Sequence, residues 1–222
     1  MKRRKKKESS DNMLEELYEK YDKLQKKYGD KSLNSIYFGG KTQNPKLCFV
    51  FMNPTAGNIA ATKEWTGPRY PWLGTKNVWK LFYQLNIIKK DLYEEIQNKK
   101  KQDWTKEFSE KVYQAIADEN CYITNLAKCT QLDARPLKDE VYKSYLKLFK
   151  KEMEIVRPEK IILFGNQVSS IVLDEKIKVS EVRKKQFKKD NFIYYSVYYP
   201  VGNGIFNIDK AIEDINYIKT EG

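Results

Sequence analysis

The stretch LCFVFMNPTAGN, residues 47–58, carries an apolar run directly into a turn. Six apolar residues come first, and a proline, a glycine and two asparagines follow, as at the end of a buried strand. Three comparable runs lie further along the chain: CYITNLA (121–127), KIILFG (160–165) and FIYYSVYY (192–199). Each is short, rich in β-branched or aromatic residues, and bounded by turn formers. We therefore predict four strands, the first three of them buried and parallel.

Helical patterns alternate with these strands. Apolar residues recur at helical spacing over 77–88, 91–118, 138–156, 167–173 and 209–218. The alternation predicts an α/β fold, a Rossmann-like three-layer α/β/α domain with a central, mainly parallel four-stranded sheet. A site is expected at the carboxyl ends of the strands, which read NPTAGN, TNLAKC, GNQ and YPVGNG. We interpret 91–118, with its KKKQ run, as a solvated insertion, a DNA-binding flank being the alternative.

The two parts of the chain differ in composition. Residues 1–11, MKRRKKKESSD, cannot build a core, so we expect a basic, disordered arm that can touch phosphates. From Asn12 onward, leucines and tyrosines at helical spacing predict one amphipathic helix that stops at Gly29. A chain of 222 residues suits one full core, so residues 12–222 are expected to form a single domain.

The chain is strongly basic. It has 42 Lys and Arg against 30 Asp and Glu, a net charge of +12. Such an excess favours a nucleic-acid partner through counterion release, and a generally lysine-rich composition is the alternative explanation. No apolar run approaches the roughly 20 residues that cross a bilayer, and the N-terminus lacks the apolar core of a signal peptide. We expect a cytoplasmic protein that associates with DNA.

Histidine is absent, and the cysteines are Cys48, Cys121 and Cys129. The absence of histidine removes the commonest general base and metal ligand, and with it the serine and cysteine triads. The cysteines stand in or beside apolar runs without CxxC spacing, which predicts buried thiols and neither disulfides nor zinc ligands. We expect no metal and no cofactor. Any chemistry must therefore use carboxylates, amides, hydroxyls, lysines or the backbone.

Several motifs occur in a recognisable order. FMNPTAGN (51–58) leads through EWTGPRYPWLG (64–74), and CYITNLAKC (121–129), IVRPEKIILFG (155–165) and YYPVGNG (198–204) follow. This order resembles the uracil-DNA glycosylase superfamily over about residues 47–204. The middle block is most similar to the iron-sulfur branch, whereas Asn-Pro in the first motif is more similar to the mismatch-specific and single-strand-selective branches.

The chain departs from that family in two places. The iron-sulfur branch uses four cysteines, and only Cys129 matches, with Ser144 near the place of the last ligand. The resemblance therefore implies no cluster. The last motif, His-Pro-Ser in the family, reads Tyr199-Pro200-Val201 here. In the family that histidine stabilises the departing uracil anion, so its replacement bears directly on activity.

The resemblance implies roles for residues at the strand ends. Asn53 would position the water that attacks C1′ of the deoxyribose, a plain turn being the alternative. Asn125 would read N3–H and O4 of uracil with its carboxamide, an Asx turn or helix cap being the alternative. Trp72 would stack on the flipped base, with Tyr70 as the fallback and a core tryptophan as the alternative.

The leaving base and the DNA backbone have candidates of their own. Tyr199 would donate its hydroxyl to the leaving base in place of the missing histidine, as would backbone N–H groups of the loop after Pro200. The remaining candidates are Met52, which would contact the base, and four residues that would contact DNA: Lys128, Gly202, Asn203 and Gly204.

These residues predict a monomeric DNA glycosylase that hydrolyses the N-glycosidic bond of uracil, or of a related deaminated base, in DNA. One alternative is a catalytically silent DNA- or base-binding protein of the same fold. Another is a nucleotide- or sugar-phosphate-binding enzyme, although neither GxGxxG nor a P-loop is present. If Asn53, Trp72, Asn125 and Tyr199 do not converge on one pocket, the glycosylase hypothesis fails.

Overall fold

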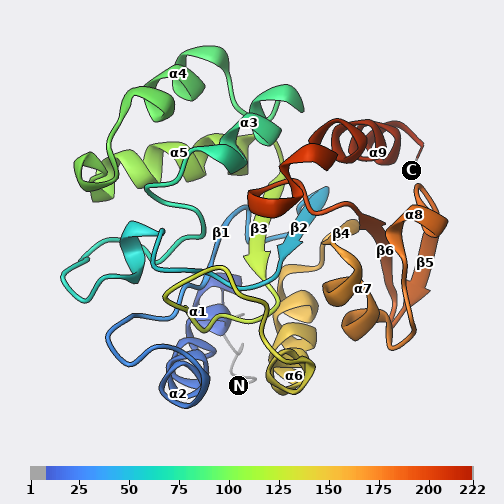
Figure 1. Cartoon of the computed structure of the whole chain (residues 1–222), viewed down its shortest axis with the longest axis horizontal. Coiled ribbons are helices and arrows are strands. Elements are labelled where there is room, and N and C mark those ends of the chain that lie inside the picture. The colour runs from blue at the N-terminus through green and yellow to red at the C-terminus, as the bar shows by residue number, and fades with distance from the viewer. Residues whose placement is uncertain (1–8, 222) are drawn as a thin grey trace, which may run out of the picture.

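A mixed sheet runs through the middle of the protein. The structure, a computed structural model, describes residues 9–221, and within them the sheet has six strands in the order β1-β3-β2-β4-β6-β5. Figure 1 shows this sheet between two groups of helices. The strands are β1 (Phe38–Gly40), β2 (Leu47–Phe51), β3 (Cys121–Asn125), β4 (Lys160–Phe164), β5 (Gln186–Lys189) and β6 (Phe192–Val197).

The four predicted strands are confirmed as the parallel centre of this sheet. β2 pairs in parallel with β3 and β4, and β4 pairs in parallel with β6. The expectation of a four-stranded sheet is corrected, because β1 and β5 add antiparallel edges. β1 reads FGG and β5 reads QFKK, and neither short segment has the apolar pattern of a buried strand.

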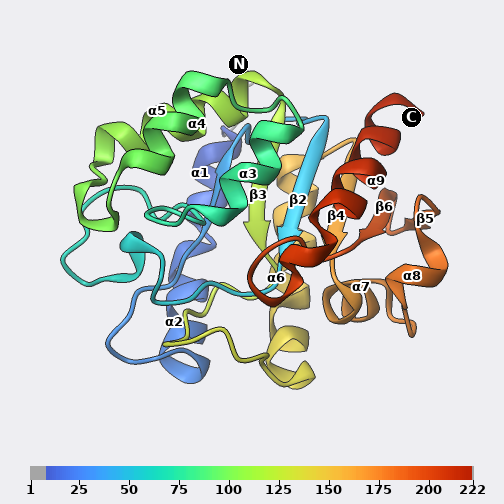
Figure 2. The same ribbon diagram turned by 45° about the horizontal axis from the view of Figure 1, so that its top comes forward.

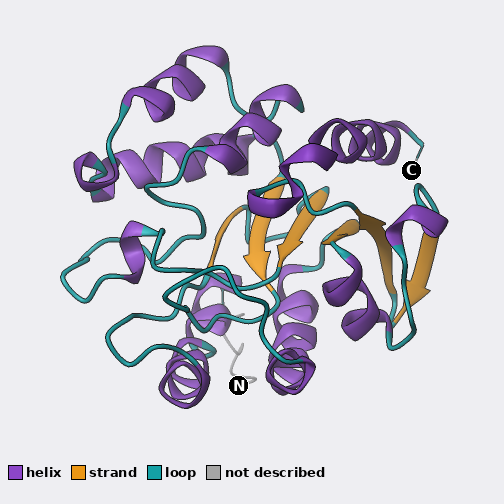
Figure 3. Cartoon of the chain, viewed as in Figure 1, coloured by secondary structure: helices purple, strands orange, loops and turns teal. Residues whose placement is uncertain are grey.

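Helices cover both faces of the sheet, so the three-layer α/β/α fold is confirmed (Figure 3). One layer holds α1 (Ser10–Glu15), α2 (Tyr18–Tyr28), α6 (Asp139–Val156) and α7 (Asn166–Leu173). The other holds α3 (Asn77–Gln84), α4 (Lys90–Asn98), α5 (Lys106–Asp118) and α9 (Ile208–Thr220). Short elements complete the chain: η1 (Ile59–Ala61), η2 (Lys101–Asp103), α8 (Val179–Val182) and η3 (Gly202–Asn207).

Successive residues of β2 face opposite layers. Cys48 and Val50 belong to the core under α1, α2, α6 and α7, whereas Phe49 and Phe51 belong to the core under α3, α4, α5 and α9. This alternation follows from the two-residue period of a strand, and it explains why a strand buried on both faces is apolar throughout. All three cysteines are free and buried, as predicted. None of the described helices is both long enough and apolar enough to span a membrane.

The range 91–118 is not a solvated insertion. It forms α4, η2 and α5, and the side chains of Ile96, Val112 and Ile116 are fully buried. α5 packs on β1 and β3 as part of a core layer. The interpretation was wrong because the lysine run and the charged outer faces dominate the composition, while the inner faces carry the packing.

The N-terminal prediction also changes. Residues 1–8 of the expected arm lie outside the described part, but Ser9 caps α1 and Asp11 accepts a hydrogen bond from Thr42. Residues 9–11, which were assigned to the arm, are therefore part of the folded domain. The single helix expected up to Gly29 is two helices with a turn at residues 16–17, since the same apolar spacing continues through the turn and hides it.

Candidate functional site

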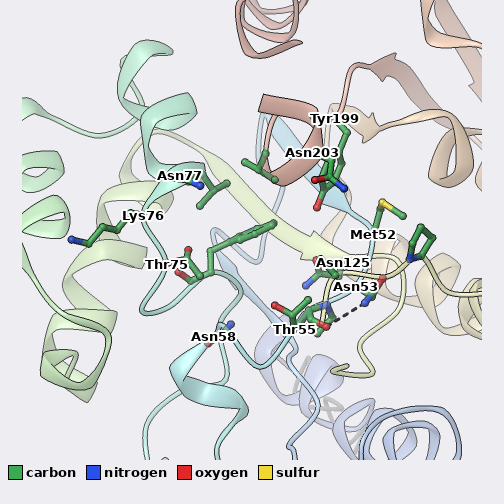
Figure 4. Close-up of a pocket in the computed structure, with 18 residues that line it drawn as sticks. Met52, Asn53, Thr55, Asn58, Thr75, Lys76, Asn77, Asn125, Tyr199 and Asn203 are labelled. Atoms are coloured by element: carbon green, nitrogen blue, oxygen red, sulfur yellow. Dashed lines mark hydrogen bonds between the residues drawn. The ribbon is translucent and has the colours of Figure 1, made fainter. Parts of the chain in front are cut away.

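Figure 2 shows that β2 and β3 end side by side. A pocket opens at these strand ends (Figure 4). Its volume is about 560 Å³. The loop after β2, the start of α3, the end of β3 and the segment from Tyr199 into η3 form its wall. The lining residues are Met52, Asn53, Pro54, Thr55, Asn58, Trp72, Thr75, Lys76, Asn77, Val78, Asn125, Ala134, Pro136, Tyr199, Val201, Gly202, Asn203 and Gly204.

The pocket brings together most of the residues named from sequence. The predicted site residues that line it are Met52, Asn53, Trp72, Asn125, Tyr199, Gly202, Asn203 and Gly204. Tyr70 and Lys128 lie outside the lining. The parallel strands explain this convergence, because their carboxyl ends reach the same edge of the sheet although the residues are far apart in sequence.

Asn53 follows β2 and is held by two contacts. Its Oδ1 accepts a hydrogen bond from the Tyr142 hydroxyl at 2.7 Å. Its Nδ2 donates to the Pro54 carbonyl oxygen at 3.2 Å, the contact that is dashed in Figure 4. A carboxamide oxygen has two lone pairs, so one remains for a water molecule in the pocket. Such an oxygen can orient water without acting as a strong base.

Asn125 ends β3 and is 1% exposed. Its backbone is fixed, because it pairs in register with Phe51 and its carbonyl oxygen accepts a hydrogen bond from Lys128 Nζ at 2.6 Å. Its carboxamide makes no hydrogen bond to any other described residue, and it lines the pocket. A buried amide in this state has a donor and an acceptor available to a ligand.

Trp72 is held in a backbone conformation that side chains rarely adopt, with φ of +65°. Hydrogen bonds clamp the carbonyl oxygens of residues 70–73, and the donors are Asn58 Nδ2 (2.9 Å), Tyr113 OH (2.6 Å), Thr75 Oγ1 (2.7 Å) and the Ile59 N–H (2.9 Å). A strained residue persists only where its surroundings determine it in this way.

The Trp72 ring, not that of Tyr70, belongs to the pocket. Trp72 packs edge-on against Phe51, with ring centroids 4.9 Å apart, and its indole N–H is buried without a hydrogen-bond partner. Tyr70 packs against Tyr113 instead, with centroids 4.3 Å apart. Tyr70, the fallback aromatic, therefore packs against α5 and does not line the pocket.

Tyr199 lines the pocket just after β6 and packs closely on η3. A side chain at Gly204 would come within 2.1 Å of the Tyr199 carbonyl oxygen, so the loop needs glycine at this place. The Tyr199 hydroxyl bonds to none of the other described residues. Burial raises the pKa of Tyr199 above its usual value. The hydroxyl is therefore a neutral donor at physiological pH.

The assignment of Lys128 to DNA is wrong. Its side chain is 1% exposed, and Nζ lies 2.8 Å from Glu152 Oε2. It also donates to Thr124 Oγ1 and to the Asn125 carbonyl oxygen. Burial lowers the pKa of the Lys128 amino group, and the Glu152 carboxylate opposes that shift. Lys128 therefore holds the backbone of Asn125 through its carbonyl oxygen, and its buried amino group is not accessible to a phosphate.

Glu152 sits at the centre of this buried cluster. Besides the lysine, its carboxylate accepts hydrogen bonds from Tyr21 (2.7 Å), Tyr122 (3.0 Å) and Thr124 (2.6 Å). Sequence patterns gave no signal for it, because Glu152 and its partners come from α2, β3, the loop after β3 and α6, and they meet only in the fold.

Two exposed apolar side chains beside the pocket were also missed. Phe206 is 91% exposed in η3, two residues beyond Gly204, and Leu132 is 64% exposed in the loop that supplies Ala134 and Pro136 to the lining. Large apolar side chains held in water beside a site often mark a binding surface. A phenylalanine within the short GNGIFN segment was the available signal.

The pocket is nearly free of charge. Lys76 is the one lysine, arginine or carboxylate residue among the described lining residues, and the other polar side chains are mainly amides and hydroxyls. Within residues 9–221 no three histidine, cysteine or carboxylate side chains gather as a metal site. The lining therefore suits a neutral, hydrogen-bonding ligand such as a nucleobase.

A family model described as the uracil DNA glycosylase superfamily matches residues 38–204. The match runs from β1 to the loop at Gly204, so it contains every pocket-lining residue described above. The chain belongs to the uracil-DNA glycosylase superfamily.

Proposed function

We propose that this protein is a DNA glycosylase that hydrolyses the N-glycosidic bond of uracil, or of a related deaminated base, in DNA. Membership of the superfamily supports glycosylase activity on damaged bases. The observation that carries the proposal is the convergence of Asn53, Trp72, Asn125 and Tyr199 on one pocket of about 560 Å³. The net charge of +12 supports phosphate contacts that do not depend on sequence.

Recognition begins when the target base leaves the helix and enters the pocket. Trp72 offers a ring for stacking, which contributes roughly 1–3 kcal/mol and tolerates different bases. Asn125 offers a carboxamide without another partner, which pairs with the N3–H and O4 edge of uracil. Cytosine presents an exocyclic amine at that edge, so the same amide orientation disfavours it.

Water completes the reaction at C1′. As the bond to the base loosens, the sugar acquires oxocarbenium character, and the water oxygen then forms the new bond to C1′. Asn53 Oδ1 orients this water through its remaining lone pair. The electron pair of the broken bond leaves with the base as an anion, which then takes up the proton released by the water. Tyr199 and the N–H groups of the Gly202–Gly204 loop stabilise that charge by hydrogen bonding.

The direct test is cleavage of labelled oligonucleotides that carry uracil, hypoxanthine, xanthine or ethenocytosine, followed by alkali to break abasic sites. We expect cleavage at uracil or at another deaminated base. Asn125→Asp should lower the uracil rate roughly 10- to 100-fold, because a carboxylate replaces the amide donor at the base edge. It should also shift activity toward cytosine, whose amine the carboxylate can accept from.

Asn216→Asp is the control for the charge change, since Asn216 is exposed on α9 and does not line the pocket. It makes the same charge change and should leave the rate unchanged. Full uracil activity in Asn125→Asp would remove this residue from base recognition.

A lesion-binding protein without catalysis is the second candidate. The observation that favours it is Tyr199 in the place where the family carries histidine. Binding of uracil-containing DNA in preference to undamaged DNA, with no abasic sites formed from any of the four bases, would establish this candidate in place of the first.

A further inference from the structure

Tyr142 contacts the pocket residue Asn53 from the helical layer that holds α1, α2, α6 and α7. It lies near the start of α6 and is fully buried, with 0% of its side chain exposed. Its hydroxyl donates to Asn53 Oδ1 at 2.7 Å, across 89 residues of sequence. Tyr142 does not line the pocket itself, so its contact with a ligand passes through Asn53.

The chemistry of the two groups makes this contact directional. Burial raises the pKa of Tyr142, so its phenol is neutral and has one proton to donate. A phenol can also accept a hydrogen bond, so both neighbours set the orientation: the Pro54 carbonyl oxygen only accepts and turns Nδ2 toward itself, and the phenol donates to Oδ1. The Pro54 contact, at 3.2 Å, lies at the long end of the hydrogen-bond range and is the weaker restraint.

We propose that Tyr142 is a positioning residue that fixes the carboxamide of Asn53 with its oxygen available to the attacking water. The inference rests on the proposed role of Asn53 in hydrolysis. Without the phenol, the amide can rotate by half a turn and place an N–H donor where the water needs an acceptor. The substrate would still bind, because Tyr142 touches neither the base nor DNA.

The same helix provides a matched control. Tyr145 lies one turn further along α6, is also 0% exposed, and has a hydroxyl without a hydrogen-bond partner among the described residues. Tyr142→Phe and Tyr145→Phe therefore remove the same atom from the same helix at the same burial. Only the first removes a contact with the proposed catalytic amide.

The test compares the two variants in single-turnover cleavage of uracil-containing DNA. Tyr142→Phe should lower the rate about tenfold, the effect of one neutral hydrogen bond, with substrate affinity unchanged. Tyr145→Phe should retain the normal rate. In an Asn53→Ala background, Tyr142→Phe should have no additional effect, since the group through which it acts is gone. A normal rate for Tyr142→Phe in an active enzyme would overturn the inference and leave the proposed function standing.

A second measurement does not depend on activity. The side-chain amide signal of Asn53 in a ¹H–¹⁵N spectrum, assigned by its loss in Asn53→Ala, should move in Tyr142→Phe and stay in place in Tyr145→Phe. An unmoved signal would overturn the positioning contact. If the signal moves but the protein cleaves no base, the contact between Tyr142 and Asn53 is supported and the proposed function is refuted. The positioning role in catalysis is then refuted as well.

Discussion

Lys128→Met tests the buried cluster beneath Asn125. The substitution keeps much of the length of the side chain and removes its charge. Glu152 would then remain 0% exposed, with its hydroxyl donors but without its cation 2.8 Å away. Removing one partner of a buried pair is costly, because the other charge stays in a poorly polarisable interior.

The expected loss in the free energy of unfolding is about 3–5 kcal/mol, the range for one broken buried pair. The remaining hydrogen bonds to Glu152 place the expectation at the lower end of that range. For a domain of this size each kcal/mol lowers the melting temperature by about 2–4 °C, so a decrease of about 6–12 °C should follow. The Asn125 carbonyl also loses a donor, which should weaken base recognition.

Urea unfolding of the wild type, Lys128→Met and Lys23→Met provides the assay. Lys23 pairs with Glu19 at 2.7 Å, but the two side chains are 68% and 77% exposed. The same change in that pair should cost less than about 1 kcal/mol. The slope of the unfolding free energy against urea concentration should be the same in all three proteins if each unfolds in two states.

Equal stability of the two variants would refute the reasoning. A contact between Lys128 and DNA makes a different prediction: Lys128→Met would leave stability unchanged and reduce the salt dependence of DNA affinity by about one ion. The two outcomes are separable, since unfolding and DNA binding are measured independently.

Three further changes test the pocket and its rim. Tyr199→Phe should lower the single-turnover rate roughly 10²- to 10³-fold with DNA affinity unchanged, because the phenol donates to charge that develops in the transition state. A nearly normal rate would assign that role to the backbone amides of residues 202–204. The raised pKa of Tyr199 keeps the phenol protonated as pH rises, and the chain has no histidine to titrate. The cleavage rate of the wild type should therefore be constant from about pH 6 to pH 9, and a bell-shaped profile would contradict this. Phe206→Ala should weaken binding to lesion-containing duplex DNA more than binding to the same single strand, because an exposed apolar side chain can insert between stacked bases. The control, Tyr217→Ala on α9, should change neither affinity.

Local patterns were sufficient to predict the parallel centre of the sheet. β2 is an uninterrupted apolar run, and β3, β4 and β6 are mainly apolar or aromatic, since a strand buried on both faces favours apolar residues on both. β1 and β5 escaped prediction because they are short edge strands, paired on one side, and their residues carry no such requirement.

The same logic places Asn53, Asn125 and Tyr199 at one edge of the sheet from the amino-acid sequence alone. Parallel strands bring their carboxyl ends together, so a polar residue that follows such a strand has a predictable position. The loop residue Trp72 also belongs to the pocket, but its strained backbone depends on clamps from Tyr113 and from other segments.

Only the tertiary structure decided how Lys128 and Tyr142 act. In sequence, a lysine after a strand suggests a surface cation, and a tyrosine on a helix suggests core packing. In the fold, Lys128 meets Glu152 of α6 inside the protein, and Tyr142 of the same helix meets Asn53. Periodicity records which face of an element is buried, but the partner of a buried polar group comes from another element, and its identity depends on how the layers pack.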